Sequence, residues 1–172
     1  MAASGRFMAP IDAADDVQLR NVLPSDLDVL FLHQADELAN RMAAFTADDP
    51  SDKIAFQRHW EQNLSDTNNR IRTIVWRGEV AGYVSSFELL GKPSIAYWVG
   101  RDFWGRGIAT AAVKQFLHIV PERPLFARVA ADNLGSIRVL EKCGFVRAGT
   151  ERSYATGRRS EIDELIFRLG EP

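Results

Sequence analysis

The sequence is poor in cysteine and in long apolar runs, and each shortage excludes a class of protein. Its single cysteine, Cys143, cannot build a disulfide framework or a zinc-ribbon site, so a reducing, cytoplasmic setting is the simplest interpretation. No stretch approaches the roughly 18 consecutive apolar residues of a transmembrane helix. Residues 1–10 also lack an apolar run of signal-peptide length. We therefore expect a cytoplasmic protein without a membrane partner.

An excess of charge is lacking as well. The 172 residues include 21 Lys and Arg against 23 Asp and Glu, a formal net charge of −2. This balance argues against nucleic acid as a direct partner, because binding to phosphates draws on a basic surface. A hydrophobic fraction of 46% is typical of a soluble globular protein. We expect a flexible N-terminal tail over residues 1–16 and a single domain over residues 17–172.

Apolar periodicity predicts an alternation of strands and helices. A strand begins near Val17, a helix that starts at Asp26 carries apolar residues as far as Leu38, and a second helix covers 52–64. The later elements, in chain order, are strands over 71–77, 80–90 and 94–99, a helix that ends before Pro121, a strand over 125–130, a helix over 136–142, and strands over 145–152 and 162–169. This order predicts an α+β protein with a mixed sheet between helices.

Glycines gather where the strand over 94–99 gives way to a helix. Gly105 and Gly107 lie just before that helix, whose first backbone N–H groups have no intrahelical acceptor and can converge on an anion. The helix dipole alone contributes about 0.3–1 kcal/mol. Holding a diphosphate would therefore need several charge-assisted N–H bonds and the side chain of Arg106. The alternative is a plain strand–turn–helix connection with glycines for geometry.

Two named phosphate-binding motifs fit this turn poorly. A Walker loop requires Gly-Lys followed by Ser or Thr, which the sequence lacks. A dinucleotide-binding fingerprint requires a third glycine, where Thr110 stands, although Asp132 follows the next strand as a ribose-binding acid would. An NAD-binding oxidoreductase is therefore the weaker hypothesis.

The stretch over 132–145 predicts a short helix, with Ser136 as a suitable N-cap and Gly144 as a left-handed stop. Its pattern Asn-x-x-Ser, then Leu-Glu-Lys-x-Gly-Phe, downstream of Gly-x-Gly-x-Ala at 105–109, resembles the GNAT N-acetyltransferase superfamily. Residues 97–99 and 104–110 resemble the branch that acetylates N-terminal Ala or Ser of proteins, including ribosomal proteins. Trp104 departs from the Gln or Arg that the superfamily usually has there.

This resemblance implies a mixed, mostly antiparallel sheet of about seven strands that splays in the middle, with helices on both faces. It implies acetyl-CoA in the splay as acyl donor, no metal, and a homodimer by analogy. The backbone amides of 106–109 would hold the pyrophosphate, the strand ending at Val99 would pair with the pantetheine arm, and Asn133 would bind that arm. The implied cofactor-binding residues are Tyr97, Trp98, Val99, Trp104, Gly105, Arg106, Gly107, Ile108, Ala109, Thr110, Asn133 and Ser136.

The implied reaction is direct attack of a neutral amine on the thioester carbonyl, whose oxygen a backbone N–H, at Val99, would stabilise. Ser136 would approach the sulfur and protonate the leaving thiolate, because no tyrosine lies between Ser136 and Phe145. The alternative for Ser136 is a helix cap only. Glu88, on a neighbouring strand, is the candidate base or substrate contact, and it would face either the cleft or solvent.

The sequence offers only Glu88 as a candidate general base, and this shortage favours an α-amine as acceptor. An α-amino group has a pKa near 8, so a sizeable share of it is neutral at physiological pH. A lysine amine has a pKa near 10.4, so its deprotonation costs about 4 kcal/mol at that pH. A protein N-terminus and a small-molecule amine both remain open, with Phe31, Met42, Phe45 and Trp60 as candidates for the acceptor pocket or for the core. The competing function is a catalytically silent CoA-binding regulatory module of the same fold.

Overall fold

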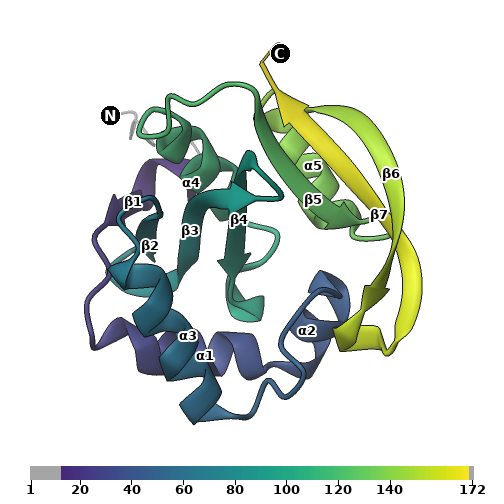
Figure 1. Ribbon diagram of the computed structural model, residues 1–172. Coiled ribbons are helices and arrows are strands. Elements are labelled where there is room, and N and C mark those ends of the chain that lie inside the picture. The colour runs from purple at the N-terminus through teal and green to yellow at the C-terminus, as the bar shows by residue number, and fades with distance from the viewer. Residues whose placement is uncertain (1–12, 171–172) are drawn as a thin grey trace, which may run out of the picture.

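A computed structural model describes residues 13–170, whose centre is a seven-stranded sheet in the order β1-β2-β3-β4-β5-β7-β6 (Figure 1). The strands are β1 Val17–Arg20, β2 Arg70–Trp76, β3 Glu79–Leu89, β4 Lys92–Val99, β5 Leu125–Ala130, β6 Val146–Ala155 and β7 Ser160–Leu169. The helices are α1 Asp26–Ala35, α2 Glu37–Ala43, α3 Lys53–Ser65, α4 Ile108–Leu117 and α5 Leu134–Lys142. Three short 3-10 helices complete the described chain: η1 Ala13–Asp16, η2 Arg101–Phe103 and η3 Thr156–Arg158.

The sheet divides between β4 and β5. These two strands run parallel and pair at one position, Ser94 with Phe126, whereas every other neighbouring pair is antiparallel. Figure 1 shows β4 and β5 diverging from that point, with α2 at the wide end. The predicted mixed, mostly antiparallel sheet with a splayed middle and helices on both faces is therefore confirmed.

The main core lies between the sheet and the helices α4 and α5. Phe116 and Val113 of α4, Leu140 of α5 and Ile74 and Leu125 of the sheet are fully buried there or nearly so. Each such side chain contributes about 1.5–3 kcal/mol through its removal from water. On the other face, α1 packs against β3, and Trp60 of α3 meets Tyr83 edge to face at 5.0 Å. The core thus fixes β4 on one side of the splay and β5 on the other.

The prediction that the first helix continues as far as Leu38 is wrong, because α1 ends at Ala35 and the chain breaks from helical conformation at Asp36. The backbone of Asp36 is extended, with ψ of 122°, and its carboxylate accepts a hydrogen bond from Ala39 N at 2.9 Å. An N-cap in mid-sequence thus starts a separate helix, α2. Apolar spacing ran on through the break, which is why the periodicity did not reveal it.

The expected flexible tail covers residues 1–16, and residues 1–12 of it lie outside the described residues. Its last four residues form η1, and Asp16 pairs with Arg77 at 2.7 Å.

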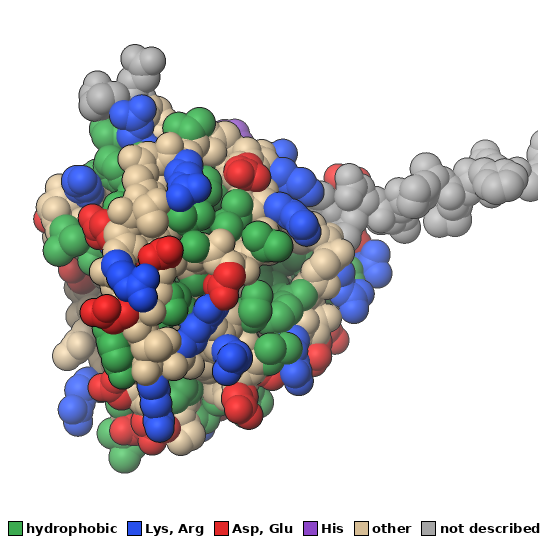
Figure 2. All heavy atoms as spheres, turned by 90° about the vertical axis from the view of Figure 1, so that its right-hand side faces the viewer, with side chains coloured by type: hydrophobic (Ala, Val, Ile, Leu, Met, Phe, Trp, Pro, Cys, Tyr) green, Lys and Arg blue, Asp and Glu red, His purple; other side chains and the backbone are tan. Residues whose placement is uncertain are grey.

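No helix among residues 13–170 is long and apolar enough to cross a membrane. On the face shown in Figure 2, Lys and Arg side chains are interspersed with those of Asp and Glu. Arg152 on β6 forms ion pairs with Glu161 and Asp163 on β7.

Candidate active site

A cavity of about 400 Å³ lies where β4 ends, between the following turn, the start of α4 and the length of α5. Every residue that the sequence analysis assigned to cofactor binding lines this one cavity, from Tyr97 on β4 to Ser136 on α5. The structure adds residues that the sequence analysis did not assign to cofactor binding, although it named Met42 as a candidate for the acceptor pocket. They are Ala39, Met42, Ala43, Phe103, Gly135, Arg138, Val139 and Lys142. Ala39 and Ala43 of α2 had no local signal, because α2 reaches the cavity only through the tertiary fold.

The turn before α4 ends in an uncapped helix N-terminus. Gly105 and Gly107 have φ of +72° and +75°, a conformation that other residues adopt at a cost. Gly107 is the N-cap, so the helix start has no capping side chain. The N–H groups of Ile108 and Ala109 have no intrahelical acceptor by geometry, and both residues line the cavity. This arrangement suits an anion.

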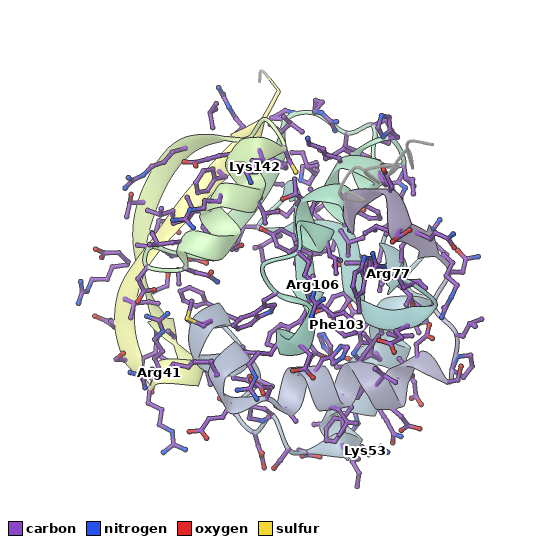
Figure 3. The ribbon with its side chains drawn as sticks, turned by 180° about the vertical axis from the view of Figure 1, so that it is seen from behind. Arg41, Lys53, Arg77, Phe103, Arg106 and Lys142 are labelled. Carbon is purple, nitrogen blue, oxygen red and sulfur yellow. The ribbon has the colours of Figure 1, made fainter. Side chains whose placement is uncertain are left out.

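Three basic side chains line the same cavity, and none of its lining residues is an Asp or Glu within the described part of the chain. Arg106 comes from the turn, and Arg138 and Lys142 from α5. Figure 3 shows Arg106 beside Phe103, with Lys142 on α5 farther toward the other half of the sheet. The lining is therefore electropositive, as an anionic ligand requires.

Arg106 rests on an aromatic base. Its guanidinium lies 5.1 Å from the centre of the Trp76 ring and donates to the carbonyl of Asp102 at 3.3 Å. Arg77 stacks on the same ring at 4.5 Å, and Phe103 meets its edge at 6.2 Å. Trp76 ends β2, so a strand of the rigid sheet orients the arginine of the turn.

Trp104 closes the turn onto β4. Its indole N–H donates to the carbonyl of Val99 at 2.8 Å. The turn is also fixed on its far side by Gly100, where a Cβ would lie 2.7 Å from the imidazole of His33. Burial lowers the pKa of His33, opposed by the nearby carboxylate of Asp102. The imidazole is therefore a neutral packing group behind the turn.

Tyr97 and Ser136 form the polar centre of the cavity. Their hydroxyl oxygens lie 2.6 Å apart, and the Tyr97 hydroxyl is also 3.1 Å from the carbonyl oxygen of Ser136. Burial raises the pKa of Tyr97, so the phenol keeps its proton at neutral pH. The sequence analysis assigned Tyr97 to cofactor binding but did not predict its contact with Ser136, because Tyr97 comes from β4 and not from α5. Its inward position between Ile95 and Val99 was the available signal.

Asn133, not Ser136, caps α5, so the predicted cap was wrong. The Asn133 Oδ1 accepts from Ser136 N at 3.1 Å, and the helix begins one residue later at Leu134. The Asn133 Nδ2 donates to the carbonyl of Met42 at 3.1 Å. Because Asn133 performs the capping, the Ser136 hydroxyl remains available to Tyr97.

A bidentate ion pair secures α2 beside Asn133. Arg158 of η3 binds Asp132 at 2.6 and 2.8 Å and donates to the carbonyl of Arg41 at 2.8 Å. The guanidinium lowers the pKa of Asp132. The wall that α2 contributes to the cavity is thereby tied to the loop before α5.

Glu88 is not brought to this site. It is exposed, pairs across the β3–β4 hairpin with Pro93, and does not line this cavity. Of the candidates for the acceptor pocket, Met42 lines the cavity described above, whereas Phe31 packs against Phe56 at 5.2 Å. Phe45 packs into a small cluster around Ala130.

A second cavity, of about 280 Å³, lies on the opposite face of β4. It contains Trp60, the remaining candidate for the acceptor pocket. Its walls come from α3, the loop after α3, and strands β2, β3 and β4. They consist of His59, Trp60, Asn63, Asn69, Ile71, Tyr83, Ser85, Ser86, Phe87 and Ala96. Ala96 and Tyr97 are consecutive, so one strand separates the two cavities.

Comparison with known proteins places these features in a family. Residues 16–146 match the family model described as an acetyltransferase (GNAT) domain. The chain is 26% identical to the uncharacterized N-acetyltransferase p20 of Bacillus licheniformis over 88% of this chain and 90% of that protein. It is 28% identical to YdaF of Bacillus subtilis (strain 168), a proposed ribosomal N-acetyltransferase, over 69% of this chain and 72% of that protein.

Solved structures share the fold. The microcin C7 self-immunity acetyltransferase MccE, in complex with acetyl-CoA and AMP, has a TM-score of 0.76 at 20% identity, over 91% of this chain and 93% of that one. RimL, the ribosomal L7/L12 α-N-protein acetyltransferase in complex with coenzyme A, has a TM-score of 0.74 at 19% identity. Its match covers 92% of this chain and 96% of that chain.

Proposed function

Because the chain belongs to the GNAT acetyltransferase family, we propose that it transfers the acetyl group of acetyl-CoA to the α-amine of a peptide or protein N-terminus. The observation that carries the proposal is one cavity that joins an uncapped, glycine-led helix N-terminus to the hydrogen-bonded pair of Tyr97 and Ser136. The first feature binds phosphate and the second supplies a proton.

The residues of the cavity fit acetyl-CoA. The free N–H groups at the start of α4 and the guanidinium of Arg106 suit the pyrophosphate, and Arg138 and Lys142 remain for the third phosphate. Beyond Ser94, the edge of β4 is not paired with β5, so its backbone is available to the amide groups of pantetheine. Asn133 is fixed by its own hydrogen bonds, and it acts by holding α5 and α2 in place.

The reaction balances without a metal or a covalent enzyme intermediate. The neutral amine attacks the carbonyl carbon, a C–N bond forms, the C–S bond breaks, and the amine nitrogen releases one proton to solvent. The departing thiolate takes a proton from Ser136, and Tyr97 restores that proton through the 2.6 Å hydrogen bond. Tyr97 then takes a proton from the solvent that received the proton of the amine, so the enzyme ends the turnover unchanged. Burial raises the pKa of Tyr97, so its hydroxyl is protonated at the start of the reaction. Glu88 has no part in this scheme, because it is exposed at the hairpin end.

The names of two relatives support the class of acceptor. YdaF is described as a proposed ribosomal N-acetyltransferase and RimL as an α-N-protein acetyltransferase. An α-amine near pKa 8 is also substantially neutral at physiological pH, so it needs little help from a base. Both points favour a protein N-terminus over a lysine side chain.

Kinetics of Tyr97→Phe and Ser136→Ala test the proposal. Each substitution removes a hydroxyl of the proton path, so we expect kcat to fall by about a hundredfold, within the usual range for general acid catalysis. The dissociation constant for acetyl-CoA, measured by calorimetry, should stay within about threefold because neither hydroxyl contacts the phosphates. A double variant no slower than the singles would show one shared path. Unchanged kcat in both single variants would remove these roles, and a wild type that binds acetyl-CoA without acetylating any amine would be a silent module.

A further inference from the structure

One backbone carbonyl of β4 points into the splay beside the cavity of about 400 Å³. A Cβ at Gly82 would lie 1.9 Å from the carbonyl oxygen of Trp98, so that carbonyl points toward β3. Carbonyl groups of successive residues point to opposite sides of a strand, so that of Val99 points away from β3 and toward the splay. Strand β5 does not take it up, because β4 and β5 pair at Ser94 and Phe126 alone. The Val99 carbonyl therefore belongs to the edge of β4 that the proposed function assigns to pantetheine.

The indole of Trp104 occupies this carbonyl. Its Nε1–H donates to the Val99 oxygen at 2.8 Å, and both residues line the cavity. The neighbouring ring of Phe103 is anchored behind the turn, where it meets the rings of His33 and Trp76 at 5.9 and 6.2 Å. Trp104 has no ring or cation–π contact of this kind within residues 13–170, and 40% of it is exposed. Its hydrogen bond to Val99 is thus the directional contact that holds a partly exposed indole.

Val99 lies where the pantetheine arm of acetyl-CoA has to pass. The proposed function assigns the pyrophosphate to the start of α4, which follows Val99 in the chain. It assigns the thioester to the pair of Tyr97 and Ser136, and Tyr97 precedes Val99 on β4. The arm joins these two ends and carries two amide groups. An amide N–H that leaves water needs an acceptor in the protein, and the Val99 carbonyl is the last one of β4 before the turn.

We propose that the Trp104 indole and an amide N–H of pantetheine compete for the Val99 carbonyl, so that the indole turns away when the arm binds and limits the affinity for it. The proposal rests on the acetyl-CoA binding of the proposed function and adds a residue that tunes it. An indole bonded to this oxygen from within the cavity also takes the space of an incoming amide. The turn is not packed at the next residue, because a Cβ at Gly105 would meet no atom within 4 Å.

This competition separates the two halves of acetyl-CoA. Acetyl-pantetheine carries the arm without the nucleotide, whereas 3′-phospho-ADP carries the phosphates without the arm. Ligands that contain the arm should displace the indole, and the nucleotide alone should leave it in place. The loss of one partly exposed hydrogen bond corresponds to a change in affinity of about fivefold.

Exchange of the indole protons with solvent, measured by NMR, gives the first test. The chain has four tryptophans, and the spectrum of Trp104→Phe identifies the signal of Trp104. We expect saturating acetyl-CoA or acetyl-pantetheine to speed the exchange of this proton by about fivefold, and 3′-phospho-ADP to leave it within about twofold. The indole of Trp60, which donates to Gln34 Oε1 and does not line the cavity, is the internal reference. Unchanged exchange at Trp104 with acetyl-CoA bound would overturn the proposal, whereas a folded protein that binds no acetyl-CoA would overturn the proposed function instead.

Calorimetry on Trp104→Phe gives the second test, because this variant keeps an aromatic ring and removes the indole N–H. We expect its dissociation constants for acetyl-CoA and acetyl-pantetheine to fall by about fivefold and that for 3′-phospho-ADP to stay within about twofold. Trp60→Phe is the matched control, and it should leave all three constants within about twofold of the wild type. Melting curves confirm that both variants are folded. A constant for acetyl-pantetheine that is unchanged or higher in folded Trp104→Phe would contradict the competition. An equal fall for 3′-phospho-ADP would contradict it too, since the effect would then lie in the phosphate-binding turn.

Discussion

Replacement of Asn133 separates two structural contributions of one side chain. Its Oδ1 caps α5 through Ser136 N at 3.1 Å, and its Nδ2 binds the Met42 carbonyl at 3.1 Å. The loss of an N-cap costs about 1 kcal/mol, and an ordinary hydrogen bond contributes about another 1 kcal/mol. Asn133→Ala should therefore lower the free energy of unfolding by about 2 kcal/mol, and Asn133→Ser, which can still cap, by about 1 kcal/mol.

Urea unfolding of the wild type, Asn133→Ser and Asn133→Ala, monitored by circular dichroism, measures both losses of unfolding free energy. A loss of about 2 kcal/mol corresponds to a fall in Tm of about 4–8 °C for a chain of this length. Titration with acetyl-CoA then tests function, because α5 and α2 both line the cavity. We expect the wild type to bind acetyl-CoA most tightly, Asn133→Ser less tightly and Asn133→Ala least tightly. An alanine variant no less stable than the serine variant would refute the capping role.

Two further perturbations follow from the contacts of Asp26 and Trp76. Burial alone would raise the pKa of Asp26, but hydrogen bonds from Arg20, Leu23 N and Thr73 outweigh it and lower that pKa. Its stabilisation is therefore present above the unfolded pKa near 3.9 and lost as pH falls through the lower folded value. Asp26→Asn should cost about 2–4 kcal/mol at neutral pH, and should flatten the acid limb of a plot of unfolding free energy against pH; an acid limb as steep as that of the wild type would contradict this. Trp76→Leu should weaken acetyl-CoA binding by about threefold through Arg106, with binding of acetyl-pantetheine, which has no pyrophosphate, unchanged; equal losses for both ligands would point to a general packing defect.

Local patterns in the sequence were enough for much of this site. Gly105 and Gly107 imposed their turn through backbone conformation alone, and the strand before them and the helix after them followed from apolar spacing. The pattern around Asn133 and Ser136 located the other wall of the cavity, although it predicted Ser136 as the cap of α5, which is Asn133. Features that depend on a few neighbouring residues are the ones a sequence can predict.

Features that join distant segments escaped the sequence analysis. The pairing of Tyr97 with Ser136 spans 39 residues, and the bond from Asn133 to Met42 spans 91. No sequence spacing predicts either contact, because tertiary packing brings these residues together. The second cavity likewise draws its walls from one helix, a loop and three strands. Glu88 was chosen by strand alternation, which cannot distinguish a cleft from the solvent beyond a hairpin end.

Calorimetry tests the central claim most directly, namely that the start of α4 and its arginine hold the pyrophosphate of acetyl-CoA. Acetyl-CoA and acetyl-pantetheine carry the same thioester and differ in the nucleotide portion with its phosphates. We expect acetyl-CoA to bind at least about tenfold more tightly, with an affinity that falls as salt is added. Equal affinities for the two ligands, or no binding heat for acetyl-CoA with folded protein, would contradict the account.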